Sequence, residues 1–147
     1  MAEKVLSYIF IFVDVTNLII MHIDHIAIWT RDIDSVKDFY VRYFNCTVGG
    51  RYVNPVKKFS SFFLSFQNGA RIELMRKDDI DGERIGEKLG LAHVALEAGS
   101  REEVDRITEQ LEREGIRIKG RPRITGDGYY ESVILDPEGN IVEIVSK

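Results

Sequence analysis

The chain carries two similar halves, each with one histidine and one glutamate at matching positions. In the first half, His25 lies in an apolar run and Glu73 follows it by 48 residues. In the second half, His93 lies in a similar run and Glu143 follows it by 50 residues. A carboxylate in an apolar strand is costly to bury unless a partner offsets its charge. The duplicated arrangement therefore suggests one metal ion that is shared by all four side chains.

Length and composition limit the classes of protein to consider. The 147 residues fit one domain, or two very small ones packed together, and a hydrophobic content of 44% is typical of a soluble globular protein. A net charge of −4 argues against nucleic-acid binding, which needs a clustered basic face. The single Cys46 cannot form an internal disulfide, so we expect a reducing compartment, the cytoplasm.

The first twenty residues differ from the rest of the chain. They are mostly apolar, but Asp14 and Asn17 interrupt them well short of the ~20 residues that a membrane span requires. They also lack the basic start and the small-residue cleavage site of a signal peptide. We therefore expect no membrane segment, an extension of unassigned role over residues 1–20, and a domain that starts at Met21.

Each half reads as a β-α-β-β-β unit. The β-like runs 23–30 and 91–97 open the two halves, and an amphipathic helix pattern follows each of them. We expect the first helix to be capped by Asp34 or Ser35, and the second by a capping box that starts at Ser100. Each half then closes with a hairpin, and short strands are expected at 48–53 and 116–119.

Strand alternation places all four candidate residues on equivalent faces. Successive side chains of a strand point to opposite faces of the sheet, so Ile26 and Ile28 oppose His25. The same phase holds around His93, Glu73 and Glu143, where aliphatic residues flank each polar one. The aliphatic residues can therefore cover the helices while the four polar side chains occupy the other face. This predicts a curved sheet whose helix-free face holds the site.

Two imidazoles and two carboxylates suit a particular group of metal ions. They mix borderline and hard donors, a set that fits Zn²⁺, Ni²⁺, Co²⁺, Mn²⁺ or Fe²⁺. The alternative is that the histidines are ordinary core residues and the glutamates face solvent from half-exposed strands. The shared phase of all four residues favours the metal, whereas His22 belongs to neither pattern and is expected on the surface.

Three sequence segments resemble the vicinal oxygen chelate superfamily, which includes glyoxalase I, bleomycin-resistance proteins and extradiol dioxygenases. The segments are residues 24–30, 91–96 and 136–144, and the resemblance covers residues 21–147. It implies an α+β fold of two tandem βαβββ modules, residues 21–78 and 90–147, that form a curved mixed sheet. The helices would lie on its outer face and a metal site in its cleft. The resemblance also implies homodimers in which a module of one chain often pairs with a module of the other.

The order of the candidate ligands is similar to that of bacterial glyoxalase I. His25, Glu73, His93 and Glu143 follow its His/Glu/His/Glu order, which implies Zn²⁺, Ni²⁺ or Co²⁺ ahead of Mn²⁺ or Fe²⁺. The implied reaction is isomerisation of a 2-oxoaldehyde–thiol hemithioacetal to a 2-hydroxyacyl thioester. The resemblance nominates Glu143 as the base that moves the carbon-bound proton, with Glu73 as the other candidate.

Two positions depart from the glutathione-binding pattern of bacterial glyoxalase I. That enzyme has Arg four residues after the first His and Asn four after the first Glu, where this chain has Trp29 and Lys77. The small-molecule substrate is then an adduct of another thiol, or no thiol adduct at all. Trp29 could line an apolar pocket or simply pack. The segment 121–130, with Arg123 and Tyr129 as candidate substrate-binding residues, could cover the substrate or be an ordinary surface connection.

Two other kinds of function compete with a glyoxalase. One is another metal-dependent reaction of the superfamily, such as epimerisation, ring-cleaving oxygenation or thiol transfer to an antibiotic. The other is a metal-free module that binds and sequesters a drug. Such binders commonly lose the metal ligands, whereas this chain retains all four, so we rank sequestration last.

Overall fold

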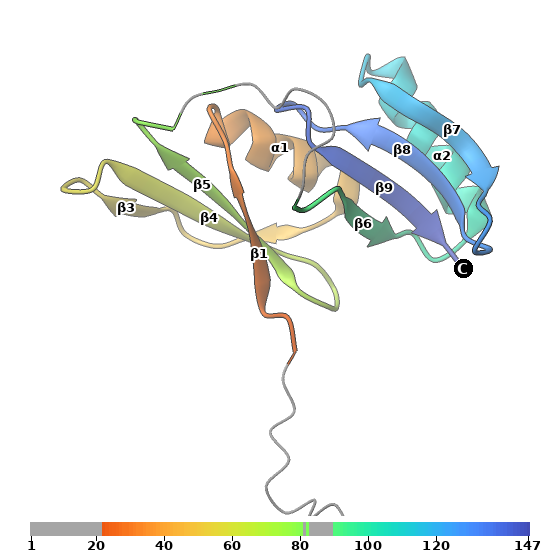
Figure 1. Cartoon of the computed structure of the whole chain (residues 1–147), viewed down its shortest axis with the longest axis horizontal. Coiled ribbons are helices and arrows are strands. Elements are labelled where there is room, and N and C mark those ends of the chain that lie inside the picture. The colour runs from red at the N-terminus through yellow and green to blue at the C-terminus, as the bar shows by residue number, and fades with distance from the viewer. Residues whose placement is uncertain (1–21, 81, 83–89) are drawn as a thin grey trace, which may run out of the picture.

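The computed structural model describes residues 22–80, 82 and 90–147, which form two mixed sheets, each covered by one helix (Figure 1). The predicted extension over residues 1–20 lies outside the described residues. Neither helix in the described part of the chain has the length and apolar composition of a transmembrane segment. The elements in chain order are β1 (His25–Trp29), α1 (Ile33–Phe44), β2 (Thr47–Val48), β3 (Tyr52–Asn54), β4 (Phe59–Ser65), β5 (Arg71–Lys77), β6 (Val94–Glu97), α2 (Arg101–Arg113), β7 (Ile118–Ile124), β8 (Tyr130–Leu135) and β9 (Ile141–Ser146).

The first module forms a sheet, called sheet A here, with the order β1-β5-β4-β2. β1 runs parallel to β5, and the other pairings are antiparallel. The single strand predicted over 48–53 is split into β2 and β3, which both pair with β4. The split falls at Gly49 and Gly50, because glycine weakens a strand and favours a bend in it.

The second module forms sheet B with the order β6-β9-β8-β7, again with one parallel pair, β6 and β9. The segment 121–130 is neither a covering loop nor a plain connection, because its first residues belong to β7 and its last residue to β8. β7 extends beyond the predicted strand at 116–119 and runs through Gly120 and Pro122. Both residues are tolerated there because β7 is an edge strand with an irregular register.

The caps explain where the two helices begin. α2 starts after Ser100, whose side chain accepts a hydrogen bond from the Glu103 amide, as the capping box predicted. α1 starts after Asp32 rather than Asp34 or Ser35, because Asp32 Oδ1 accepts from the Ser35 amide at 3.0 Å. This earlier start brings Ile33 into the helix, where it is buried.

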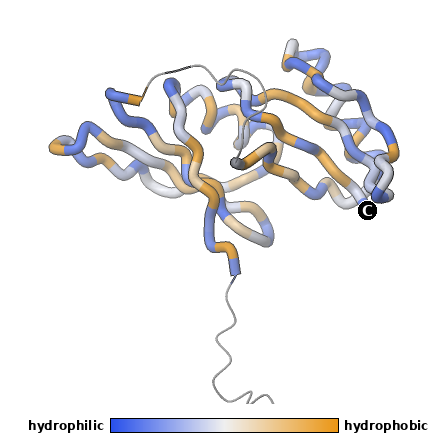
Figure 2. The backbone as a smooth tube through the Cα atoms, viewed as in Figure 1, coloured by the Kyte–Doolittle hydropathy of each residue, from blue (hydrophilic) through white to orange (hydrophobic). Residues whose placement is uncertain are grey.

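The predicted division of the strands into an aliphatic and a polar face is confirmed. Ile72, Leu74, Val142 and Ile144 are buried, and they belong to one apolar core that also includes buried residues of both helices. In Figure 2 the hydrophobic stretches of sheet B follow β8 and β9, whereas the connecting turns are mostly hydrophilic. The α+β architecture of two tandem modules is therefore as expected, with each module forming its own hydrogen-bonded sheet.

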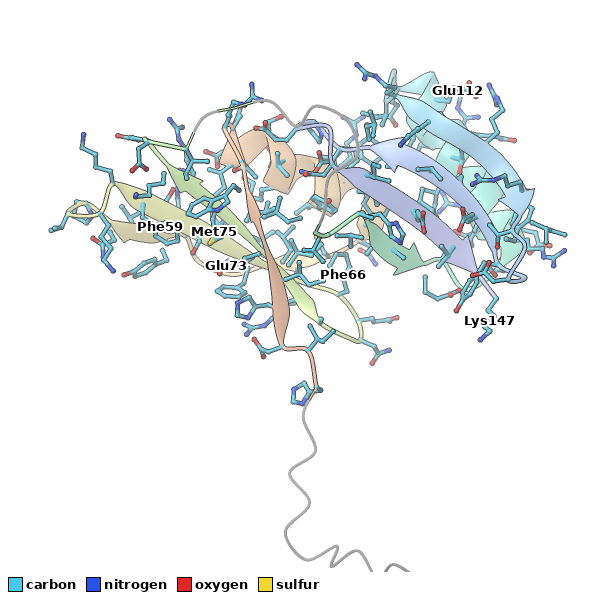
Figure 3. The ribbon with its side chains drawn as sticks, in the orientation of Figure 1. Phe59, Phe66, Glu73, Met75, Glu112 and Lys147 are labelled. Carbon is cyan, nitrogen blue, oxygen red and sulfur yellow. The ribbon has the colours of Figure 1, made fainter. Side chains whose placement is uncertain are left out.

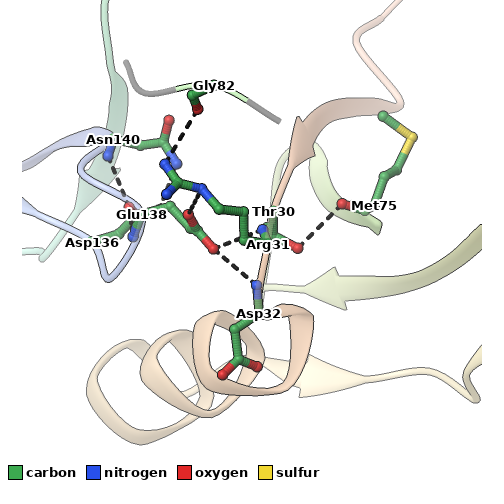
Figure 4. A network of polar contacts seen from close by, with 8 residues as sticks. All are labelled: Thr30, Arg31, Asp32, Met75, Gly82, Asp136, Glu138 and Asn140. Atoms are coloured by element: carbon green, nitrogen blue, oxygen red, sulfur yellow. Dashed lines mark hydrogen bonds and ion pairs between the residues drawn. The ribbon is translucent and has the colours of Figure 1, made fainter. Parts of the chain in front are cut away.

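A polar network joins the two modules between the start of α1 and the turn that precedes β9 (Figure 4). Glu138 Oε1 accepts hydrogen bonds from the backbone amides of Arg31 at 2.7 Å and Asp32 at 2.9 Å. Glu138 Oε2 lies 3.5 Å from Nε of Arg31. The buried Asp136 shapes the turn by accepting from the amides of Glu138 and Asn140. The Glu138 carboxylate therefore helps to fix the start of the first helix to the second module.

Replacing Glu138 tests how much this network contributes to the free energy of unfolding. Glu138→Ala removes the acceptor of two amides and the partner of one guanidinium, so we expect the free energy of unfolding to fall by about 1–3 kcal/mol. The measurement is urea denaturation followed by circular dichroism. Glu109→Ala, at an exposed ion pair on α2, is the control and should change stability by less than about 0.5 kcal/mol. Equal effects of the two substitutions would contradict the assignment.

Candidate metal and substrate site

His25 and Glu73 form a pair on the neighbouring parallel strands of sheet A. In the register of β1 and β5, Ala27 lies beside Glu73, so His25 is two residues away along β1. Both side chains occupy the face opposite α1, and Nε2 of His25 lies 3.7 Å from Oε2 of Glu73. The side chains are 39% and 16% exposed, so the imidazole is open to a ligand from solvent.

His93 and Glu143 form the same pair in sheet B. Here Ala95 lies beside Glu143 in the register of β6 and β9, which gives His93 the same two-residue offset. Nε2 of His93 lies 3.2 Å from Oε2 of Glu143, and the side chains are 43% and 18% exposed. The duplication in the sequence is therefore a duplication of one local geometry.

The structure brings the four predicted ligands together as two pairs rather than as one cluster. Among the described residues, no three His, Cys, Asp or Glu side chains converge closely enough to hold a metal ion. Each pair presents one imidazole and one carboxylate, which is half of the predicted donor set. Binding of one ion by all four residues stays a prediction.

A network of three neighbours orients the His25 ring. Asp24 Oδ2 lies 2.9 Å from Nδ1 of His25 and also bonds the Arg71 guanidinium. These contacts, that of His25 foremost and then that of Arg71, lower the pKa of Asp24 below its usual value. Phe63 packs edge-on to the imidazole with ring centroids 5.2 Å apart, and Arg71 lies over the Phe63 ring. The ionised Asp24 can only accept, so Nδ1 carries a proton and Nε2 is the ring nitrogen that faces Glu73.

The helix-free face of sheet A is largely aromatic next to the His25–Glu73 pair. Trp29, a predicted substrate-binding residue, lies on this face with its ring edge-on to Phe59 at 6.2 Å. Phe59, Glu73 and Met75 follow β4 and β5 in Figure 3. Trp29 also lines a cavity of about 240 Å³ between β1 and the start of the second module, which His93 lines from the other side. The position of Trp29 suits an apolar part of a ligand.

The helix-free face of sheet B is charged instead. Arg123, the second predicted substrate-binding residue, lies on β7 with Nη2 3.1 Å from Oε1 of Glu131. Burial foremost, and then the nearby Glu143, raise the pKa of Glu131, while Arg123 opposes them. Tyr129, the third, lies in the turn between β7 and β8, where Lys147 Nζ is 5.5 Å from its ring centroid. Tyr129 therefore lies outside the paired strands, whereas Arg123 lies within them.

Sequence reasoning missed Asp24 and Glu131. Asp24 directly precedes His25, and a carboxylate beside a candidate ligand is a recognisable signal for an orienting partner. Glu131 and Val133 are two residues apart in a run that the sequence predicts as a strand, so they share one face. Because Val133 pairs with Glu143, Glu131 lies on the same face as Glu143. Its burial depends on β7 and β9, which lie on either side of it only in the folded sheet.

The sequence of both modules matches a known family model. This model, the Glyoxalase/Bleomycin resistance protein/Dioxygenase superfamily, matches residues 22–144. The chain belongs to this superfamily. The matched range contains both His–Glu pairs, so the superfamily resemblance read from the sequence is confirmed.

Similar proteins include one sequence relative that matches over part of its length and solved structures that share the fold at low identity. An uncharacterized Bacillus subtilis protein, YqjT, is 39% identical over 62 residues, which are 40% of this chain and 48% of that protein. Glyoxalase I from Zea mays superposes with a TM-score of 0.72 at 22% identity, covering 86% of this chain and 44% of the maize enzyme. A domain from Frankia sp. EAN1pec gives 0.74 at 16% identity, covering 86% and 98%. The matches thus span less than half the length of the first two relatives.

Replacing Asp24 tests how the His25 ring is oriented. In metal-free protein at about pH 8.5, where an ordinary histidine is neutral, we expect the ¹⁵N NMR signals of His25 to report the Nδ1–H tautomer. Asp24→Asn replaces the carboxylate with an amide that can donate or accept, so a mixture of tautomers should appear. The His93 signals are the internal control and should not change. A single Nδ1–H tautomer in the variant would contradict the role of Asp24.

Proposed function

We propose that this protein is a metal-dependent, glyoxalase I-like lyase. It would isomerise a 2-oxoaldehyde–thiol hemithioacetal to a 2-hydroxyacyl thioester. The observation that carries the proposal is the pair of matched His–Glu contacts, with the same strand offset and closely similar side-chain exposure in both modules. Superfamily membership and the likeness to maize glyoxalase I support it.

The donor groups themselves fit a cation. Nε2 of His25 and the carboxylate of Glu73 face each other across 3.7 Å. An imidazole nitrogen and a carboxylate placed in this way can hold either a proton or a metal cation between them. Imidazole and carboxylate together suit Zn²⁺, Ni²⁺ or Co²⁺, and also Mn²⁺ or Fe²⁺.

A second copy of the chain would complete the site. Each protomer offers two half-sites on separate sheets, and both are open to solvent. We propose that His25 and Glu73 of one protomer meet His93 and Glu143 of its partner. A dimer then contains two complete sites, each with four protein ligands.

Under this proposal, different residues of the chain would have different roles in the reaction. A bound divalent ion would supply Lewis-acid stabilisation of the negative charge that develops on the substrate oxygens. Glu143 would take the carbon-bound proton and return it to the neighbouring carbon, while the hydroxyl proton passes to the adjacent carbonyl oxygen, which balances the isomerisation without a co-reactant. His25 and His93 would remain ligands, and the aromatic face of sheet A would exclude water from the reacting carbons.

A complementation experiment tests the shared site. One variant combines His25→Ala with Glu73→Ala, and the other combines His93→Ala with Glu143→Ala. Each variant alone should bind no Ni²⁺ or Zn²⁺, but the co-expressed heterodimer should recover one ion, because one of its two sites regains all four ligands.

Metal content is measured by mass spectrometry on heterodimers purified with two different tags. A heterodimer without metal would contradict the shared site. Metal-free wild-type protein would instead support a drug-binding module.

Exchanging each glutamate for glutamine tests the choice of base. Glu143→Gln should lower kcat for methylglyoxal–thiol adducts by about 10²–10⁴-fold while the protein keeps its melting temperature. Glu73→Gln is the matched control, since it changes the same atoms in the equivalent strand. Its loss should be smaller when both variants are compared at equal metal content. If Glu73→Gln is the more damaging change, Glu73 is the base.

A further inference from the structure

The two candidate histidines differ in what holds the ring nitrogen that faces away from the glutamate. In sheet A, Nδ1 of His25 donates to Oδ2 of Asp24 at 2.9 Å. Asp24 is itself held in place by Arg71, whose amide donates to the Asp24 carbonyl at 2.9 Å and whose guanidinium bonds the Asp24 carboxylate. The His25 ring is therefore fixed by a carboxylate that has its own support in the β1–β5 pairing.

An aromatic ring supports the same imidazole from its side. Phe63 packs edge-on to the His25 ring, and the Arg71 guanidinium lies 4.3 Å from the centroid of the Phe63 ring. In the register of sheet A, Arg71 lies beside His25 and Phe63 lies beside Glu73. Residues on or next to three neighbouring strands, β1, β5 and β4, thus hold this one ring.

The half-site of sheet B lacks these supports. The positions that match Asp24, Phe63 and Arg71 hold apolar residues, which are Ala92, Val133 and Ile141. In the described part of the chain, the one polar contact of the His93 ring is that with Glu143, at 3.2 Å. Both sheets nevertheless have the same offset between histidine and glutamate. The fold therefore does not require the polar network around His25.

This difference decides which ring nitrogen is free to bind a cation. A neutral imidazole carries one proton, and a metal ion takes the nitrogen that lacks it. In sheet A the nearer carboxylate is Asp24, at 2.9 Å from Nδ1, whereas Glu73 lies 3.7 Å from Nε2. The proton is thus favoured on Nδ1, and Nε2 is left for the ion. In sheet B the contacting carboxylate faces Nε2 of His93, so a proton there competes with the ion.

We propose that Asp24 and Arg71 make the half-site of sheet A the anchoring half of the metal site and leave the half-site of sheet B as the exchangeable half. Asp24 is a positioning residue, because it holds the His25 ring and its proton without being a ligand. The inference rests on the proposed function for the identity of the bound group, a divalent cation. It also supports Glu143 as the base, since that carboxylate belongs to the more weakly held half.

Titration of each half-site with Ni²⁺ tests the proposal. The variant with His93→Ala and Glu143→Ala keeps only the half-site of sheet A, and the variant with His25→Ala and Glu73→Ala keeps only that of sheet B. Two ligands hold an ion too weakly for it to survive purification, so binding is followed at about pH 8 through the paramagnetic broadening of the NMR signals of the remaining histidine ring. The dissociation constant of the sheet A half-site should be lower by about tenfold or more.

Replacing Asp24 in the sheet A variant tests the source of this difference. Asp24→Asn should weaken Ni²⁺ binding by about 10–100-fold, because a carboxylate no longer holds the proton on Nδ1. Asp79→Asn is the matched control, since it removes the same charge from an exposed ion pair with Lys77 beyond the far end of β5. It should leave the affinity unchanged. Melting temperatures show whether each variant is folded. Equal Ni²⁺ affinities of the two half-sites, or an unchanged affinity in Asp24→Asn, would overturn the proposal.

The outcomes are distinguishable from those of the proposed function. If the wild type retains metal but the two half-sites bind Ni²⁺ equally, the lyase proposal stands and the anchoring role of Asp24 is wrong. If the sheet A half-site binds more tightly but the heterodimer recovers no ion, the shared site is wrong and the anchoring role is supported. If Ni²⁺ broadens neither histidine, the anchoring role is overturned.

Discussion

The parallel pairing of β1 with β5 and of β6 with β9 is the constraint on which the site depends. In each pair, alternate residues are aliphatic and pack under a helix, so a slip of one residue would expose the core and bury the histidine and glutamate. The register that builds the core therefore also sets the His–Glu contacts at 3.7 and 3.2 Å. The two His–Glu pairs require no scaffold beyond the one that stabilises each module.

Polar contacts fix how the first helix meets the second module. Glu138 presents its carboxylate to the amides that precede α1, where the helix dipole favours negative charge. Tyr40 of α1 donates to the buried Asp136 in the same turn. This turn leads directly into β9, the strand that carries Glu143. The placement of α1 is thereby coupled to the strand that holds the nominated base.

Those features that depend on local periodicity were predictable from the sequence, and those that depend on distant neighbours were not. The faces of β1, β5, β6 and β9 follow from simple alternation. The true cap of α1 was missed because Asp32 is held partly by Glu138, which lies 106 residues away. The length of β7 was missed because Gly120 and Pro122 normally end a strand, and only the bulged edge position accommodates them.

The predicted convergence of the four residues on one ion depends on information of a different kind. Alternation shows that each His–Glu pair points away from its helix, but the relative placement of two open faces is not encoded in either module's local pattern. Each face is complete as a folded surface, with the histidines 39% and 43% exposed. Whether two faces meet is decided by contacts between modules or between chains, on which a strand pattern carries no information.

The two modules carry equivalent His–Glu pairs, but the residues beside the pairs differ. This difference bears on which glutamate would act as the base. Glu73 and Glu143 have the same offset from their histidines, so pair geometry alone cannot distinguish them. Beside Glu73 lies the aromatic Phe63, which contacts His25 and shields the pair. Beside Glu143, the carboxylate of Glu131 shares the face, and burial foremost and then the nearby Glu143 raise the pKa of Glu131, while Arg123 opposes them. Under the proposed function, this asymmetry supports Glu143 as the base and sheet A as the apolar side of the site.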